Sequence, residues 1–211
     1  VPWDAGVTNR PGARHGPREI RNQSSLARRV NHQTRVCPYE LARIADLGDV
    51  SVNPCDMDET MDRVVAFYAG VRKAGALPLS AGGDHMVTLP ILRGLHDGTP
   101  LGLVHFDAHS DTTDSYFGGT KLTHGTPFRR AIEEGLIDPN DAQGLGEAYD
   151  RLRVVEHRLQ MVADRQTHAL PSDPAALDNV ARLDGLPDGA ALVAELRGLC
   201  ADVAARYDRL L

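Results

Sequence analysis

Paired cysteines, long apolar runs and an excess of basic residues are all missing from this 211-residue sequence. No apolar run approaches the length of a membrane span, and the first residues lack the charged-then-apolar order of a secretory signal. The net charge of −6 argues against nucleic acid or an anionic membrane as a partner. The three cysteines are scattered without a C-x-x-C motif, which favours reduced, structural thiols in a cytoplasmic protein: Cys37, Cys55 and Cys200.

The remaining composition is that of a soluble globular protein, and its pattern changes after about residue 140. We therefore interpret residues 1–140 and 146–211 separately. In the first part, residues 76–83 and 101–106 have the pattern of short buried strands, and 85–98 has that of a crossover helix. A crossover of this length favours parallel neighbouring strands. The first part is therefore predicted to be α/β.

Helices are predicted on both sides of this change in pattern. Residues 55–75 form an amphipathic helix with Asp56 or Asp58 as its N-cap and Gly75 as its stop signal. We interpret this Asp-x-Asp as a capping pair rather than as metal ligands. From residue 146 onward, three helical patterns follow one another without a strand, which predicts a small helical segment.

Possible metal ligands follow the second predicted strand at every second position. Asp107, His109 and Asp111 share one face if the extended backbone continues, because residues two apart point the same way. His85 follows the preceding strand and would open onto the same edge of a parallel sheet. Carboxylate and imidazole together suit Mn²⁺, with Fe, Co, Ni or Zn also compatible. Such an ion lowers the pKa of bound water and supplies a nucleophile near neutral pH.

Other interpretations of these residues remain open. The segment DAHSD alone fits an N-cap loop with exposed acids as well as a metal site, and GGDH one βα unit earlier favours the metal site. Asp84 is expected to orient a ligating imidazole. His124 is either a neighbour of the next helix's N-cap or a general acid/base. His105 is assigned to core packing.

Several segments resemble one known family. AGGDHMVTLPILRG, HFDAHSDTTDSYFGG and THGTPFRRAIEEGLIDP resemble the ureohydrolases, the arginase and agmatinase family. VTNRPGARHGPREIRNQSS is similar to the agmatinase and guanidinobutyrase branch. The resemblance covers residues 1–139. It implies a partial three-layer αβα parallel sheet, two manganese ions, and hydrolysis of a guanidino compound such as agmatine or guanidinobutyrate to urea and an amine.

The resemblance also implies roles for individual residues. His124 would assist proton transfer to the leaving amine, and a loop would contact the substrate through Asp114, Ser115 and Tyr116. Because relatives assemble as trimers or hexamers, a homo-oligomer is compatible with the resemblance. The metal ligands would be His85, Asp107, His109 and Asp111, with Asp107 bridging.

One expected feature of the family is missing from the sequence. The family supplies two further aspartate ligands from an Asp-x-Asp segment on a later strand, and no Asp-x-Asp follows Asp111 here. We therefore expect at most one bound divalent ion. Residues 146–211 resemble a helical segment of glutamine synthetase adenylyltransferase. The alternatives to a hydrolase are thus a non-catalytic fusion product whose helical tail covers the sheet edge, or a helical binding module related to that enzyme.

Overall fold

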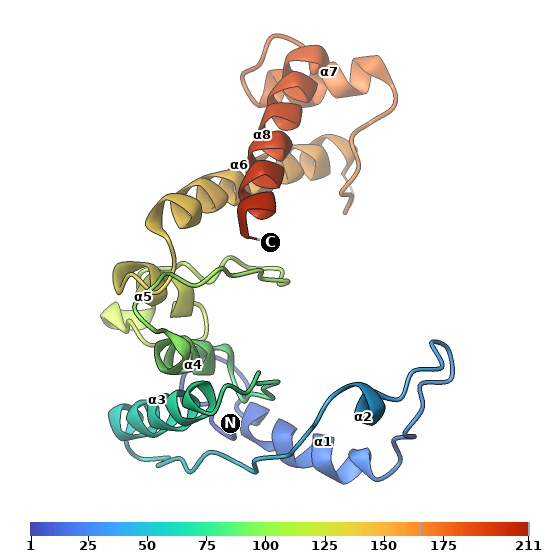
Figure 1. The fold of residues 1–211 in the computed structure, drawn as a ribbon. Helices are drawn as coiled ribbons and strands as arrows, with labels where there is room; N and C mark the ends of the chain where they lie inside the picture. The colour runs from blue at the N-terminus through green and yellow to red at the C-terminus, as the bar shows by residue number, and fades with distance from the viewer. Residues whose placement is uncertain (165, 211) are drawn as a thin grey trace. The chain divides into compact units, whose positions relative to one another are not determined.

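The computed structural model describes residues 1–164 and 166–210 and divides the chain into two compact units (Figure 1). Unit 1 comprises Val1–Leu101 and Asp111–Leu136, and unit 2 comprises Gly102–Ser110 and Ile137–Leu211. The predicted division at residues 140 to 146 stays a prediction. No helix within the described ranges is long and apolar enough to cross a membrane.

The helices of unit 1 follow the capping signals of the sequence. The Asp56 side chain accepts a hydrogen bond of 2.9 Å from the Glu59 amide, which confirms the predicted N-cap. Gly75 has a φ of 65°, the left-handed conformation with which many helices end. The helices are α1 (Gly16–Ser24), α2 (Pro38–Leu41), α3 (Met57–Lys73), α4 (Thr88–Leu95) and α5 (Pro127–Glu133), with 3-10 turns at Ala13–His15, His85–Val87 and Phe117–Gly119.

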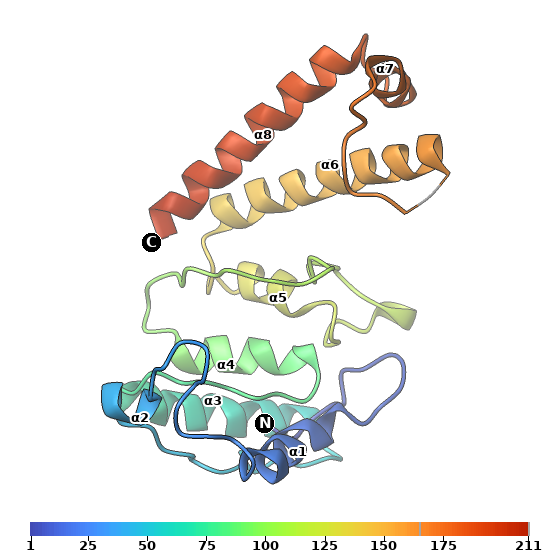
Figure 2. The same cartoon turned by 90° about the vertical axis from the view of Figure 1, so that its right-hand side faces the viewer.

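Helices α3 and α4 lie side by side and form the core of unit 1 (Figure 2). Gly94 allows their close approach, because a Cβ there would lie 2.7 Å from both the Tyr68 Cβ and the Val65 carbonyl oxygen. The apolar side chains that recur at helical spacing on the two helices therefore face inward, as expected of amphipathic helices. The side chains buried at this contact include Met61, Val64, Tyr68, Val71, Leu89 and Leu92.

The predicted partial parallel sheet is not confirmed. Within residues 1–164 and 166–210, the structure contains no strand ladder, and its one isolated bridge joins Tyr116 to Thr120. Several large apolar side chains of the predicted strands are exposed, with Leu77 at 97% and Phe106 at 95%. A parallel strand is stable when both of its faces are covered. Without such cover, these segments do not form a strand ladder in the described residues.

A short stretch of backbone pairing does exist in unit 1. The Val1 nitrogen donates to the Ala81 carbonyl at 2.7 Å, and the Asp84 amide donates to the Trp3 carbonyl at 2.9 Å. Gly83 permits this contact, because a Cβ there would overlap the Trp3 backbone. The first residues therefore lie directly against the segment that leads to His85.

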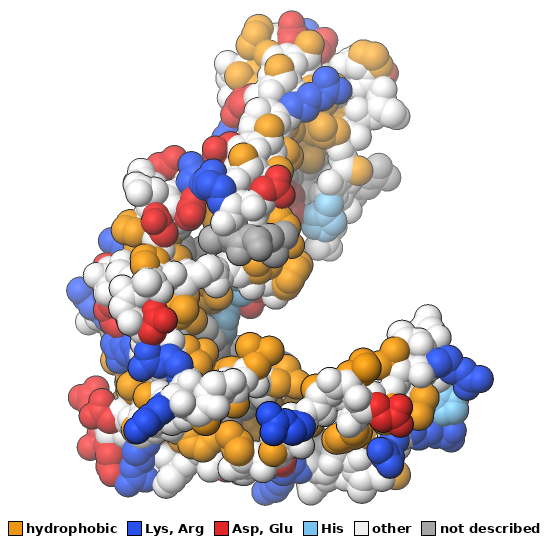
Figure 3. Space-filling model, viewed as in Figure 1, with side chains coloured by type: hydrophobic (Ala, Val, Ile, Leu, Met, Phe, Trp, Pro, Cys, Tyr) orange, Lys and Arg blue, Asp and Glu red, His pale blue; other side chains and the backbone are white. Residues whose placement is uncertain are grey.

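Surface-exposed apolar side chains are frequent in the segment that carries α1 and α2 (Figure 3). They include Ile20, Leu26, Val30, Val36, Tyr39, Leu41, Ile44 and Leu47. The Arg21 guanidinium links two parts of this segment, because it donates hydrogen bonds to Asp46 at 2.7 Å and to Asp49 at 2.5 Å. Because so few of its apolar groups are buried, the segment adds little to the core of unit 1.

Unit 2 consists mainly of α6 (Pro139–Ala163), α7 (Pro174–Leu183) and α8 (Gly189–Leu210). Its three helices occupy the region where the sequence predicts helices without a strand, although α6 begins before residue 146. Asp138 and Asp173 cap α6 and α7 through backbone amides. The core shared by the three helices contains Val155, Leu159, Val180, Ala181 and Leu192.

An ion-pair network around the buried Asp184 joins the helices of unit 2. Arg151 on α6 pairs with Asp184, the residue after α7, and with Glu195 on α8. The side chain of Asp184 is only 4% exposed. Hydrogen bonds from Arg151 lower the pKa of the Glu195 carboxyl, so the network stabilises the ionised acid.

Candidate metal centre

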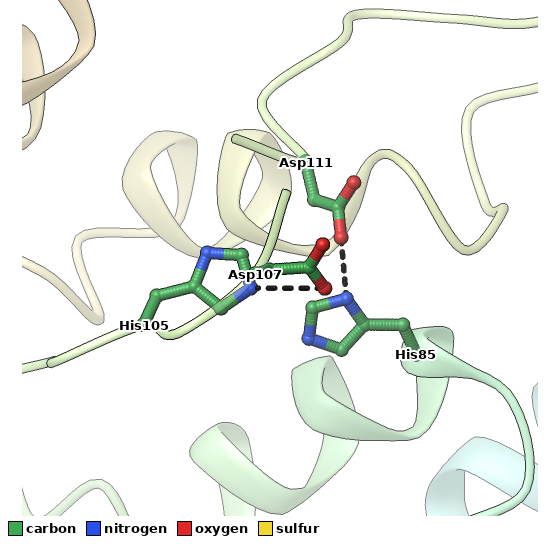
Figure 4. A group of neighbouring side chains, drawn as sticks. All are labelled: His85, His105, Asp107 and Asp111. Carbon is green, nitrogen blue, oxygen red and sulfur yellow. Dashed lines mark hydrogen bonds and ion pairs between the residues drawn. The ribbon is translucent and has the colours of Figure 1, made fainter. Parts of the chain in front are cut away.

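Unit 1 brings two of the predicted ligands into direct contact. The Nδ1 atom of His85 meets the Oδ2 atom of Asp111 in a short hydrogen bond (Figure 4). His85 opens the 3-10 turn His85–Val87, and Asp111 lies in a loop with a left-handed φ of 50°. Asp tolerates this conformation better than most residues do. One imidazole nitrogen and one carboxylate oxygen therefore converge from segments 26 positions apart.

The first turn of α5 holds both members of this pair. The Phe128 amide donates to the Asp111 carbonyl at 3.2 Å. The Phe128 ring meets the His85 ring edge to face, with centroids 5.4 Å apart and planes at 82°. Phe128 is 5% exposed, so a buried, well-packed side chain fixes where the pair lies.

Unit 2 contains the other predicted ligands around one carboxylate. The Asp107 oxygens lie 3.5 Å from the His109 Nδ1 and 3.5 Å from the His105 Nε2 (Figure 4 draws the contact with His105). The His109 amide also donates to Asp107 Oδ1 at 3.0 Å. The side chain of His109 is 80% exposed, which leaves its ring accessible to a ligand.

His105 is a residue whose role the sequence analysis missed. Assigned there to core packing, it instead places a ring nitrogen near the Asp107 carboxylate. The signal was present in the sequence, because His105, Asp107 and His109 continue the same two-residue alternation.

His124 lies at a tight turn before α5. Its amide donates to the Gly6 carbonyl at 2.9 Å, and its ring Nδ1 lies 3.1 Å from the same oxygen. Its ring is next to that of Tyr116, with centroids 5.7 Å apart. The structure therefore brings together the predicted acid/base and one residue of the predicted substrate loop.

The other two residues of that loop lie in different surroundings. The Asp114 carboxylate accepts a 2.7 Å hydrogen bond from the buried Arg130, and this bond holds the pKa of Asp114 below its ordinary value. Ser115 is half-buried. Asp114 is therefore already paired with a guanidinium of the protein itself.

Asp84 does not have the partner that the sequence suggested. Within the described part of the chain, its two carboxylate oxygens do not bond to a histidine ring. They accept hydrogen bonds from the backbone amides of Gly6, at 2.8 Å, and Met86, at 2.6 Å. Burial raises the pKa of the Asp84 carboxyl, and the two amides oppose this rise. Its place before the turn His85–Val87 makes it the N-cap of that turn.

The donor atoms in both units suit a divalent first-row metal. His85 and Asp111 supply nitrogen and oxygen in unit 1, and Asp107 and His109 supply them in unit 2. Carboxylate oxygen and imidazole nitrogen, without thiolate, are the ligand types of Mn²⁺ and similar ions. Each pair therefore fits the kind of ion that the sequence predicts.

The sequence matches the model of the Arginase family over residues 1–172. The chain belongs to the arginase family. It is 65% identical over 139 residues to a guanidinopropionase of Pseudomonas aeruginosa, covering 66% of this chain and 44% of that relative. It is 46% identical over 139 residues to a mitochondrial agmatinase of Gallus gallus, covering 65% of this chain and 41% of that relative.

A solved amidino hydrolase structure resembles this one as well. The proclavaminate amidino hydrolase of Streptomyces clavuligerus matches with a TM-score of 0.57 at 38% identity, covering 65% of this chain and 46% of that one. This likeness supports the α/β ureohydrolase fold that the sequence predicts, although its paired strands are not formed in the described residues. The chain spans less than half the length of these relatives.

Proposed function

We propose that this chain carries a divalent-metal site of the arginase family and hydrolyses a guanidino compound to urea and an amine. The observation that carries the proposal is the contact of His85 with Asp111, both fixed by Phe128. An imidazole nitrogen and a carboxylate oxygen brought together from distant segments are ligand types that suit a divalent first-row ion.

The proposed ligands are His85, Asp107, His109 and Asp111, with manganese as the preferred ion. Such an ion, when bound, supplies Lewis acidity and lowers the pKa of bound water. A guanidinium carbon is a poor electrophile because resonance spreads its positive charge, so hydrolysis requires this activation. Carboxylates near the site would offset the charge of the substrate.

His124 is proposed to give a proton to the leaving amine. Its ring lies beside Tyr116 at the edge of the predicted substrate loop, and histidine can hold or release a proton near neutral pH. Asp114, Ser115 and Tyr116 are proposed to contact the far end of the substrate. The similarity to a guanidinopropionase supports a guanidino acid as the substrate, with agmatine as the alternative.

The test is urea release by the full chain preloaded with Mn²⁺, offered 3-guanidinopropionate, 4-guanidinobutyrate, agmatine and arginine separately. We expect urea from at least one of them and the highest kcat/KM with a guanidino acid. His109→Ala should abolish turnover. His32→Ala, at an exposed position of unit 1, is the matched control and should leave it unchanged.

A folded chain that binds Mn²⁺ and releases no urea from any of these compounds would contradict the proposed hydrolysis. Equal turnover by wild type and His109→Ala would contradict the assignment of His109.

A further inference from the structure

We infer that Gly6 and Asp84 are positioning residues that hold His124 in one tautomer, with its proton on Nδ1, so that Nε2 is the atom that takes up a proton and then gives it to the leaving amine. The inference rests on the proposed function in one respect, since it takes the role of His124 in proton transfer from that proposal. The hydrogen bonds that carry it lie entirely within unit 1.

The first step concerns the ring of His124. Its Nδ1 lies 3.1 Å from the Gly6 carbonyl oxygen. A carbonyl oxygen only accepts hydrogen bonds, so Nδ1 must carry a proton. In a neutral imidazole the proton on one nitrogen leaves the other as a base, and the Gly6 carbonyl therefore selects Nε2 for proton transfer.

The second step concerns the carbonyl that makes this selection. The same Gly6 oxygen accepts the His124 amide at 2.9 Å, so it fixes both the backbone and the ring of that residue. Gly6 itself is buried, and its amide donates to Asp84 Oδ2 at 2.8 Å. The other oxygen of Asp84 accepts the Met86 amide at 2.6 Å. Asp84 thus ties the Gly6 loop to the turn that carries His85.

The third step explains why position 6 requires glycine. A Cβ on Gly6 would lie 2.8 Å from the Met86 Cβ and 3.1 Å from Asp84 Oδ1. The Met86 Cβ cannot rotate away, because it is attached directly to the backbone. A larger residue at position 6 would therefore push the carbonyl away from the His124 ring.

The experiment measures the tautomer directly and does not depend on turnover. In the ¹⁵N-labelled full chain, long-range ¹H–¹⁵N correlations identify the protonated nitrogen of His124 at about pH 8, above the usual histidine pKa. A His124→Gln variant assigns the signals. We expect the Nδ1–H form to predominate in the wild type.

Two variants then test the positioning. Gly6→Ala should convert His124 to a mixture of tautomers or to the Nε2–H form, as should Asp84→Asn, whose amide group replaces one acceptor oxygen with a donor. Gly16→Ala is the matched control, because a Cβ there would meet only the Gly82 carbonyl at an ordinary 3.5 Å. It should retain the wild-type tautomer. Where urea is formed, Gly6→Ala should lower kcat by about 100-fold, the lower end of the effect of losing an acid/base group.

A predominant Nε2–H form in the wild type would overturn the inference, as would an unchanged Nδ1–H form in folded Gly6→Ala. Absence of urea would contradict the proposed function alone, since the tautomer is measured without substrate.

Discussion

Replacing Gly94 with alanine tests the packing of α3 against α4. The added Cβ would lie 2.7 Å from the Val65 carbonyl oxygen and 2.7 Å from the Tyr68 Cβ, both held by α3. Overpacking of this kind costs about 1–3 kcal/mol. Alanine regains about 0.5–1 kcal/mol over glycine in a helix. We therefore expect Gly94→Ala to lower the free energy of unfolding by up to about 2.5 kcal/mol.

The matched control is Gly70→Ala on α3, where a Cβ would meet no atom within 4 Å. There the helix propensity acts alone, so the free energy of unfolding should rise by about 0.5–1 kcal/mol. The assay is urea unfolding followed by the fluorescence of Trp3, the one tryptophan of the sequence, which is buried in unit 1. If Gly94→Ala is as stable as Gly70→Ala, the close contact of the two helices is wrong.

The remaining predictions concern charged groups. Burial disfavours the ionised Asp4 carboxyl, but the Arg14 and Gly12 amides and the Arg14 guanidinium outweigh it and lower the pKa. Its stabilisation is therefore full above about pH 4 and is lost as the pH falls through the depressed pKa, so Asp4→Asn should flatten the loss of stability measured in acid titrations below that pH. Arg151→Met should destabilise unit 2 by about 1–3 kcal/mol in urea unfolding followed by circular dichroism, because it breaks the network joining three helices. Arg153→Met removes a pair within α6 alone and should cost less than about 1 kcal/mol; equal losses in the two variants would contradict the role of Arg151.

Local signals in the sequence predicted the helices well. The Asp56 cap, the Gly75 stop and the apolar spacing of α3 act within a few residues, so each can be recognised without the fold. The alternation of Asp107 and His109 likewise predicted that both lie near one another.

Long-range features could not be predicted in the same way. The contact of His124 with Gly6 joins residues 118 positions apart, and no periodicity marks it. The buried partners of Asp84 are backbone amides, and because every residue type except proline has one, the sequence does not mark them. The patterns at 76–83 and 101–106 show that these segments are apolar. A parallel strand also requires a neighbouring strand to pair with and elements that cover both faces of the sheet.

The central claim is that His85 and Asp111, which meet within unit 1, take part in holding a divalent metal ion. A titration of the full chain with Mn²⁺, in which electron paramagnetic resonance measures the free ion, tests it most directly. Asp97→Asn is the control, since Asp97 is outside the proposed ligand set and accepts hydrogen bonds from the amide and hydroxyl of nearby Thr99. We expect the wild type and the control to bind at most one ion with equal affinity, and Asp111→Asn to bind it at least about tenfold more weakly. Unchanged affinity in a folded Asp111→Asn variant would contradict the account.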